Sequence, residues 1–176
     1  FAGTAGGAYR STDGGATWAG VDGFNEHPQR KAWCSGDQDG TPDGAKLHSI
    51  LVDPRDPDVC YAAALGHLWG PNEERGVYKT TDGGKSWKAV LSIDADTGAC
   101  DVVLDPRNAS TVYAAMYMRR RTAYSYASGG PQGGIYRSDD AGATWKKLAG
   151  GLPAQTGRIG LDVFAGDPKI VYAVVE

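Results

Sequence analysis

Short apolar runs alternate along the chain with clusters of Gly, Pro, Asp and Asn. Apolar runs bounded by turn residues predict β-strands, and no segment shows a sustained helical period with caps. One unit reads LHSILVD, VCYAAAL, GVYKT and WKAVL, and the next reads CDVVLD, TVYAAMY, GIYRS and WKKLA. The pattern therefore predicts an all-β chain made of four-stranded units.

Incomplete copies of this unit flank the two complete ones. FAGTA, GAYRS and TWAGV precede them, and GRIGLDVF and IVYAVVE follow. Four strands repeating every 50 to 60 residues or so are typical of propeller blades and not of helical solenoids. We predict that residues 1–176 form a single partial β-propeller of four-stranded antiparallel blades, two complete and two partial. Its approximate units are residues 1–22, 47–92, 99–150 and 157–176.

An octapeptide recurs between the third and fourth strands of each unit, as STDGGATW, TTDGGKSW and SDDAGATW. Its aspartate can accept backbone N–H groups across a tight turn, and its glycines permit positive φ. The tryptophan is predicted to point inward between neighbouring sheets. Alanine replaces the first glycine in the third copy, which predicts that only the second glycine needs positive φ. The positions with these structural roles are Ser11, Asp13, Gly15, Thr17, Trp18, Thr80, Asp82, Gly84, Ser86, Trp87, Ser138, Asp140, Gly142, Thr144 and Trp145.

The octapeptides match the pattern S-x-D-x-G-x-T-W, and the chain resembles bacterial Asp-box, or BNR, repeat β-propeller proteins related to the sortilin ectodomain. The stretch from Trp18 to Pro57 is similar to a second group, the sialidase-like glycosyl hydrolase repeat proteins. The resemblance implies that the boxes lie on the rim away from substrate. Asp13, Asp82 and Asp140 would then be scaffolding residues and not catalytic ones. It also implies a parent protein that is secreted or periplasmic.

Composition narrows the function classes. Hydrophobic residues make up 41% of the chain and charged residues 22%, which is ordinary for a globular domain. The net charge of −3 argues against a nucleic-acid or anionic-membrane surface, and no apolar stretch is long enough for a membrane span. Cys34, Cys60 and Cys100 form no CxxC pair, so we expect neither a metal knuckle nor a complete disulfide framework. No cofactor is predicted.

Binding residues are expected in long inter-strand loops, which begin near Gly20, Gly66 and Met118. The loop from Met118 mixes arginines with tyrosines, which suits sugar or carboxylate recognition; the alternative is a solvated loop whose arginines pair with acidic residues. The loop from Gly66 offers either a small binding platform or a cap on the blade edge. The candidate ligand-binding residues are His67, Trp69, Arg119, Arg120, Arg121, Tyr124 and Tyr126.

Carboxylates gather in the loop that begins at Gly20. Asp37, Asp39 and Asp43 form a weak calcium candidate, because the distal bidentate glutamate of a calcium loop is missing. Glycoside hydrolysis needs two carboxylates about 5 to 9.5 Å apart. No spacing in the sequence selects such a pair, so the catalytic residues stay unassigned and the chain is not predicted with certainty to be an enzyme.

Two functions fit these observations. The first is a segment of an extracytoplasmic Asp-box β-propeller that acts as a scaffold and as a glycan- or protein-binding module. The alternative is a fragment of a sialidase- or xyloglucanase-like glycoside hydrolase that uses paired carboxylates from the inter-strand loops. A closed propeller has about 4 to 8 blades. The open flanks are therefore expected to meet the remaining blades of a larger propeller or other copies of the chain.

Overall fold

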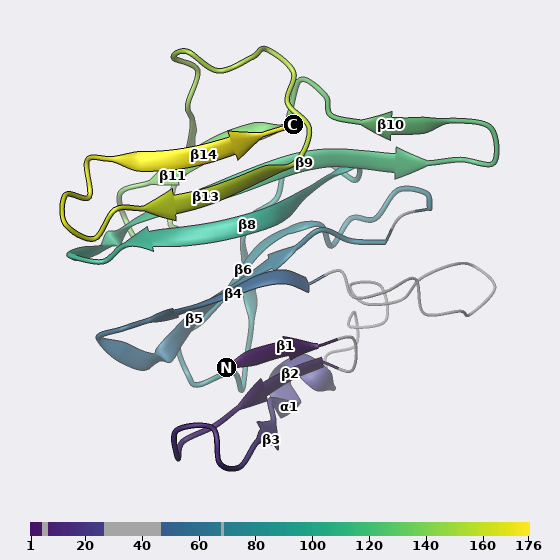
Figure 1. Cartoon of the computed structure of the whole chain (residues 1–176). Helices are drawn as coiled ribbons and strands as arrows, with labels where there is room; N and C mark the ends of the chain where they lie inside the picture. The colour runs from purple at the N-terminus through teal and green to yellow at the C-terminus, as the bar shows by residue number, and fades with distance from the viewer. Residues whose placement is uncertain (5–6, 27–46, 68) are drawn as a thin grey trace.

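The computed structural model describes residues 1–4, 7–26, 47–67 and 69–176, which form antiparallel β-sheets stacked side by side (Figure 1). One short helix, α1 (Asp22–Asn25), lies among them. No helix in these ranges is long and apolar enough to cross a lipid bilayer. The strands are β1 (Ala2–Thr4), β2 (Gly7–Arg10), β3 (Ala19–Gly20), β4 (Leu47–Asp53), β5 (Asp56–Ala64), β6 (Gly76–Thr80), β7 (Lys88–Leu91), β8 (Thr97–Asp105), β9 (Asn108–Arg121), β10 (Tyr126–Ser128), β11 (Gly134–Ser138), β12 (Lys146–Lys147), β13 (Ile159–Val163) and β14 (Val171–Val175).

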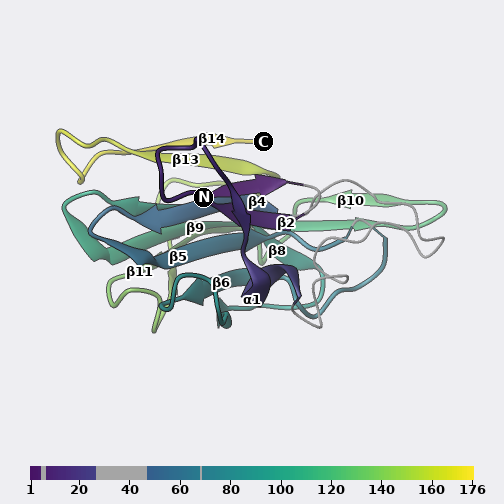
Figure 2. The same cartoon turned by 90° about the horizontal axis from the view of Figure 1, so that it is seen from below.

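Each sheet is an antiparallel meander of strands that follow one another in the chain. The orders are β1-β2-β3, then β4-β5-β6-β7, then β8-β9-β11-β12 with β10 added along the end of β9, and finally β13-β14. The view from below shows these sheets layered one over another (Figure 2). The predicted fold class is confirmed: two four-stranded blades lie between two partial ones.

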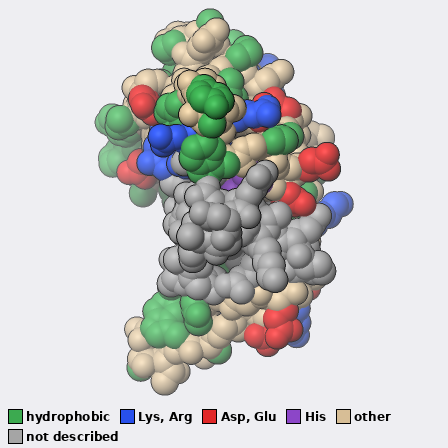
Figure 3. Space-filling view, turned by 90° about the vertical axis from the view of Figure 1, so that its right-hand side faces the viewer, with side chains coloured by type: hydrophobic (Ala, Val, Ile, Leu, Met, Phe, Trp, Pro, Cys, Tyr) green, Lys and Arg blue, Asp and Glu red, His purple; other side chains and the backbone are tan. Residues whose placement is uncertain are grey.

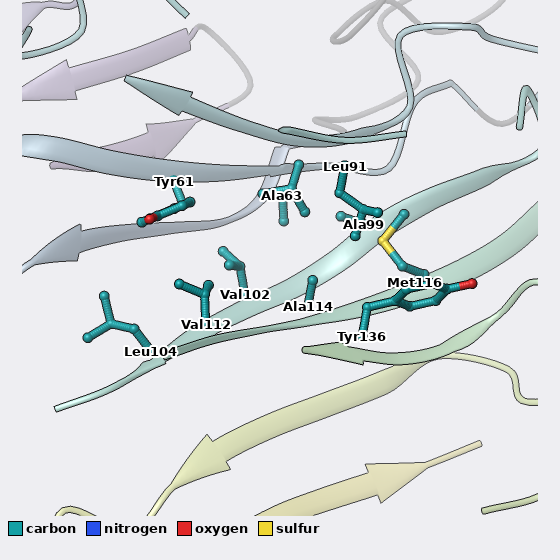
Figure 4. Packing of buried hydrophobic residues seen from close by; sticks show 11 residues of the cluster. Tyr61, Ala63, Leu91, Ala99, Val102, Leu104, Val112, Ala114, Met116 and Tyr136 are labelled. Carbon is teal, nitrogen blue, oxygen red and sulfur yellow. The ribbon is translucent and has the colours of Figure 1, made fainter. Parts of the chain in front are cut away.

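The second strand of each complete blade is buried on both faces, because a sheet lies on either side of it. In β5, Tyr61 and Ala63 face β8 and β9, whereas Ala62 and Ala64 face the first sheet. Figure 4 shows the first of these interfaces, where Met116 of β9 fills the space beside Ala63 and Leu91. Small residues in β5 thus let neighbouring sheets approach closely while larger ones from the next blade close the gaps.

The sequence repeat is also a repeat of strand register. Tyr61 of β5 lies opposite Lys79 of β6, and Tyr113 of β9 lies opposite Arg137 of β11. Equivalent residues therefore occupy equivalent places in successive blades.

The Asp-box turn joins the third and fourth strands through a compact set of hydrogen bonds. In the third copy, Ser138 Oγ donates to Asp140 Oδ1 over 2.7 Å and accepts the Gly142 N–H over 2.8 Å. The two carboxylate oxygens of Asp140 accept the backbone N–H and the hydroxyl of Thr144 over 2.7 and 2.6 Å. The Trp145 indole donates to the Gly142 carbonyl over 3.1 Å. The same bonds recur in the other two copies.

The three box tryptophans are not equally buried. Trp87 packs against the cluster between the first two sheets, and Trp145 packs against the cluster between the second and third. Trp18 is 49% exposed, so the prediction that all three indoles point inward is wrong for this residue. Each indole packs toward the sheet that precedes its own, and within the described residues no sheet precedes β1-β2-β3.

The prediction that only the second glycine position takes positive φ is also wrong. Gly14 and Gly83 occupy the first position with φ of 70° and 71°, and Ala141 adopts φ of 57° in the third copy. The backbone of Ala141 is fixed from both sides, because its N–H donates to Ser110 O over 2.8 Å and its carbonyl accepts the hydroxyl of Tyr61 over 2.9 Å. These bonds hold an alanine in a conformation that favours glycine.

Replacing Ala141 with glycine is expected to raise the free energy of unfolding by up to about 1 kcal/mol. Relief of the left-handed strain outweighs the extra entropy that glycine gives the unfolded chain. Gly84→Ala is the matched opposite, because its φ is 94° and a Cβ there would collide with Val21. It is expected to destabilise by about 1 to 3 kcal/mol. Urea denaturation of both variants checks the pair; a destabilising A141G would contradict the strain argument.

Acid is expected to destabilise the blades through the box aspartates. Hydrogen bonds from the threonine hydroxyl, the threonine N–H and the serine hydroxyl lower the pKa of Asp13 and of Asp140 from 3.8 to about 2. Hydrogen bonds led by Ser86 lower the pKa of Asp82 as well. Because the folded state has the lower pKa, this stabilisation is full above about pH 4 and is lost as pH falls toward about 2.

The Asp140→Asn variant tests this origin of acid sensitivity. An asparagine cannot titrate, so the free energy of unfolding of D140N should fall less steeply than that of the parent chain between about pH 4 and pH 2. Urea midpoints measured across this range check the slope. An unchanged slope would place the acid sensitivity elsewhere.

Candidate functional site

Two segments that are far apart in the sequence meet at one end of the stacked sheets. Trp69 forms an isolated parallel bridge with Arg121, and the Arg121 guanidinium lies over the Trp69 ring, 5.3 Å from its centroid. The predicted loops from Gly66 and Met118 thus supply one shared surface. We call Trp69, Arg121, Arg119, Tyr117 and Tyr126 the aromatic–arginine cluster.

The segment after Met118 is not the long loop that the sequence analysis predicted. Strand β9 continues to Arg121 and pairs with β10, with Arg121 opposite Tyr126 and Arg119 opposite Ser128. Thr122 closes the hairpin, because its N–H donates to Ser125 O over 2.8 Å. Because β9 includes the arginines, their side chains alternate between the two faces of the strand.

The three successive arginines have three different environments. Arg120 forms an ion pair with Asp96 at 3.1 Å, as the solvated-loop alternative expected of all three. Arg121 stacks on Trp69 instead. Arg119 lines a cleft of about 220 Å³, whose lining residues are Tyr117, Arg119, Tyr126, Arg158 and Glu176.

Two tyrosine hydroxyls form the polar rim of this cleft. The Tyr117 hydroxyl lies 3.1 Å from that of Tyr126 and 2.8 Å from Ser128 Oγ. Burial raises the pKa of Tyr117. The hydrogen bond between Tyr126 and Tyr117 lowers the pKa of Tyr126. The pair thus presents hydroxyl groups beside a guanidinium, the donor set that suits a sugar or a carboxylate.

A buried cation supports the segment that carries Trp69. Arg75 is fully buried, and its Nη1 donates to Leu65 O over 2.6 Å while its Nη2 donates to His67 O over 2.7 Å. Desolvation lowers its pKa to about 10, so the side chain stays charged at neutral pH. Sequence reasoning missed Arg75, because the run Glu73-Glu74-Arg75 is typical of a solvated turn.

The remaining candidates lie apart from this cluster. Tyr124 is fully exposed at the tip of the β9–β10 hairpin. His67 is partly buried and contributes its carbonyl to Arg75. The calcium candidates fall outside the described residues; they are Asp37, Asp39 and Asp43.

The Asp-box turns lie at the opposite end of the strands from the cluster. Ser138, which begins the third box, pairs with Val112 near the start of β9, whereas Arg121 ends the same strand. Figure 3 looks at the cluster end and shows basic and hydrophobic side chains side by side. The aromatic–arginine cluster and the row of Asp-box turns thus lie at opposite ends of the strands.

Comparisons with known proteins show which repeats the chain contains and which enzymes it is similar to. A family model described as BNR/Asp-box repeat matches residues 9–19, 78–89 and 136–147. A probable oligoxyloglucan-reducing end-specific xyloglucanase from Neosartorya fischeri is 29% identical over 162 residues. The match covers 92% of this chain and 16% of that protein.

Solved structures share the fold at lower identity. The GH74 xyloglucanase from Xanthomonas campestris superposes with a TM-score of 0.66 at 16% identity, covering 98% of this chain and 24% of that one. An ancestral GH74 enzyme superposes with a TM-score of 0.61 at 18% identity, covering 97% of this chain and 19% of that one. The GH74 enzyme of Niastella koreensis superposes with a TM-score of 0.57 at 18% identity, covering 98% of this chain and 24% of that one. The chain thus spans about a fifth of the relatives that it matches. The chain therefore contains three BNR/Asp-box repeats, and its stacked four-stranded antiparallel sheets have the fold of a β-propeller segment.

Proposed function

We propose that this chain is part of a glycoside hydrolase that acts on xyloglucan-type glucans, and that the aromatic–arginine cluster binds the sugar chain. The sequence similarity to a probable xyloglucanase over 92% of the chain carries this proposal. It favours the hydrolase alternative over a scaffold that only binds.

The chemistry of the cluster supports sugar binding. The apolar C–H face of a glucose or xylose ring packs on an indole, and its hydroxyls accept from a guanidinium or exchange hydrogen bonds with tyrosine. Trp69 is partly buried and is held by Arg121, so little side-chain entropy is lost when a ring stacks on it. Arg119 and the Tyr117–Tyr126 pair lie along the same strand pairing and extend the polar contacts.

Two carboxylates near this surface are already engaged within the chain. Asp96 is paired with Arg120, and Glu74 accepts a hydrogen bond from Asn72. A general base must be able to reach water and a general acid must reach the glycosidic oxygen. We therefore propose that this surface holds the substrate and that the catalytic pair comes from other residues of the enzyme.

Replacing Trp69 with alanine is expected to weaken binding of a xyloglucan oligosaccharide at least about tenfold, because a stacking surface is lost. Isothermal titration calorimetry measures the affinity, and thermal unfolding checks that the variant remains folded. Trp18→Phe is the matched control, since it removes an exposed indole at the opposite end of the strands. Its affinity should equal that of the parent chain.

The choice of ligand tests the substrate class. Xyloglucan oligosaccharides should bind more tightly than unsubstituted glucan chains of equal length, because side-chain xylose adds rings and hydroxyls for the cluster to contact. Undiminished binding by a folded W69A, or equal affinity for unrelated polysaccharides, would contradict the proposal.

A further inference from the structure

Arg75 holds the main chain on both sides of Trp69. Its side chain is fully buried, and its guanidinium donates to Leu65 O over 2.6 Å and to His67 O over 2.7 Å. It also donates to Gly70 O over 3.5 Å. Two of these acceptors precede Trp69 in the chain and the third follows it directly, so one cation fixes the path of the backbone that carries the indole.

The blade fold does not require an arginine at this position. In each complete blade a tyrosine of the third strand donates its hydroxyl to the carbonyl four residues earlier, which makes Arg75 and Gly133 equivalent. The N–H of each donates to the carbonyl three residues earlier, so both blades share this turn. The blade with Gly133 keeps all four strands without a side chain here. Burying a charge costs free energy, so the guanidinium serves something other than the stacking of strands.

The backbone that Arg75 bonds also lies against the next blade. Leu65 O packs on Gly98 of β8 so closely that a Cβ at Gly98 would lie 2.4 Å from it. Gly98 is opposite Tyr117 of β9, a member of the aromatic–arginine cluster. The Leu65 backbone, held by Arg75, thus abuts the strand pair that bears Tyr117.

A second contact joins the turn that ends at Arg75 to the arginine strand. The Asn72 N–H at the start of this turn donates to Ala95 O over 2.8 Å. The carbonyl of the following residue, Asp96, accepts the Arg119 N–H over 3.0 Å. The turn therefore contacts both halves of the cluster, which come from different blades.

Arg75 packs directly on the segment that it bonds. Gly66 takes φ of 79°, and a Cβ there would lie 2.4 Å from Asn72 Oδ1 and 2.7 Å from Arg75 Cγ. The turn and the segment thus meet without room for a side chain between them. A change in the length or charge of Arg75 would therefore displace the backbone that carries Trp69.

We propose that Arg75 is a positioning residue for the sugar-binding surface. It holds Trp69 beside Arg121, so that a sugar ring stacked on the indole also meets the polar groups of the next blade. This inference rests on the proposed function, because the ring that Trp69 binds is the sugar of that proposal. Arg75 is fully buried and acts on the sugar only through Trp69.

Substitution of Arg75 tests the positioning. Arg75→Met removes the guanidinium and releases the backbone beside Trp69, so affinity for a xyloglucan oligosaccharide should fall at least about fivefold. Arg75→Lys keeps the charge but lacks the fork that reaches acceptors on both sides of the indole, so its affinity should lie between those of R75M and the parent chain. Isothermal titration calorimetry measures the affinities, and thermal unfolding shows which variants are folded.

Arg55→Met is the matched control, because it removes an arginine from the β4–β5 turn, at the other end of β5 from Leu65. There Arg55 forms an ion pair with Asp53 at 3.1 Å. This variant should bind the oligosaccharide as the parent chain does. A folded R75M with the parent affinity would overturn the proposal. If R75M does not fold, the parent affinity in R75K would overturn it equally.

A double-mutant cycle separates positioning from a general loss of structure. If Arg75 acts through Trp69, the change R75M made in the W69A background should lower the affinity by less than about twofold. R75K is used in the cycle if R75M does not fold. Losses that add in full would show that Arg75 acts by another route, and the positioning role would be wrong.

A measurement without sugar distinguishes this inference from the proposed function. With 5-fluorotryptophan in place of the five tryptophans, fluorine NMR reports each indole, and W69F identifies the Trp69 resonance. R75M and R75K should shift this resonance more than those of Trp87 and Trp145. An unmoved Trp69 resonance in the folded variants overturns the role of Arg75 even if the parent chain binds sugar. A moved resonance in a chain that binds no xyloglucan oligosaccharide overturns the proposed function, and with it the sugar-binding part of this inference, while the hold of Arg75 on Trp69 stands.

Discussion

The rest of the structure depends on the hydrogen bonds that each Asp-box carboxylate accepts. Each carboxylate accepts one backbone N–H and two hydroxyl groups from serine or threonine. Asp82 accepts hydrogen bonds from Ser86 and Thr80 in this way, within a turn in which Thr80 is buried and Ser86 is exposed. Without these bonds, the backbone N–H groups of the tight turn would lack hydrogen-bond partners where neighbouring blades pack against each other. Because the third turn is satisfied internally, it can dock on the preceding blade through the single carbonyl of Ala141 and leave the apolar strands to stack.

This docking links the local turn to the long-range architecture. Ala141 shows how strongly the constraint acts: the position keeps positive φ even where glycine has been lost, since bonds to Ser110 and Tyr61 fix its backbone on both sides. The repeat is therefore conserved within the chain as geometry and less strictly as residue type. A blade lacking Tyr61 and Lys79, which both donate to the Ala141 carbonyl, would lose a contact that joins two sheets and not merely a bond within one turn.

The strands and their order could be predicted from the sequence because the information is local. Period and turn chemistry define β4 through β9, and the octapeptide identifies the hairpin that it closes. The stacking of Arg121 on Trp69 could not be predicted, because no sequence spacing relates a loop of one blade to the end of a strand in the next blade. Arg75 was missed for a related reason: its burial depends on carbonyls that only the folded chain brings together. Trp18 has the same sequence context as Trp87 and Trp145. It is exposed because no sheet among the described residues precedes its own.

The two ends of each blade are separated, so one repeat can keep a constant turn at one end while the side chains at the other end differ. The start of β9 lies against a box turn that tolerates little change, whereas its far end extends past the sheet to pair with β10 and carry three arginines. Side chains there change the surface without touching the carboxylate bonds at the other end. Residues at the far end can therefore vary from blade to blade while the turns stay nearly constant, as the three octapeptides and the dissimilar loops of this chain do.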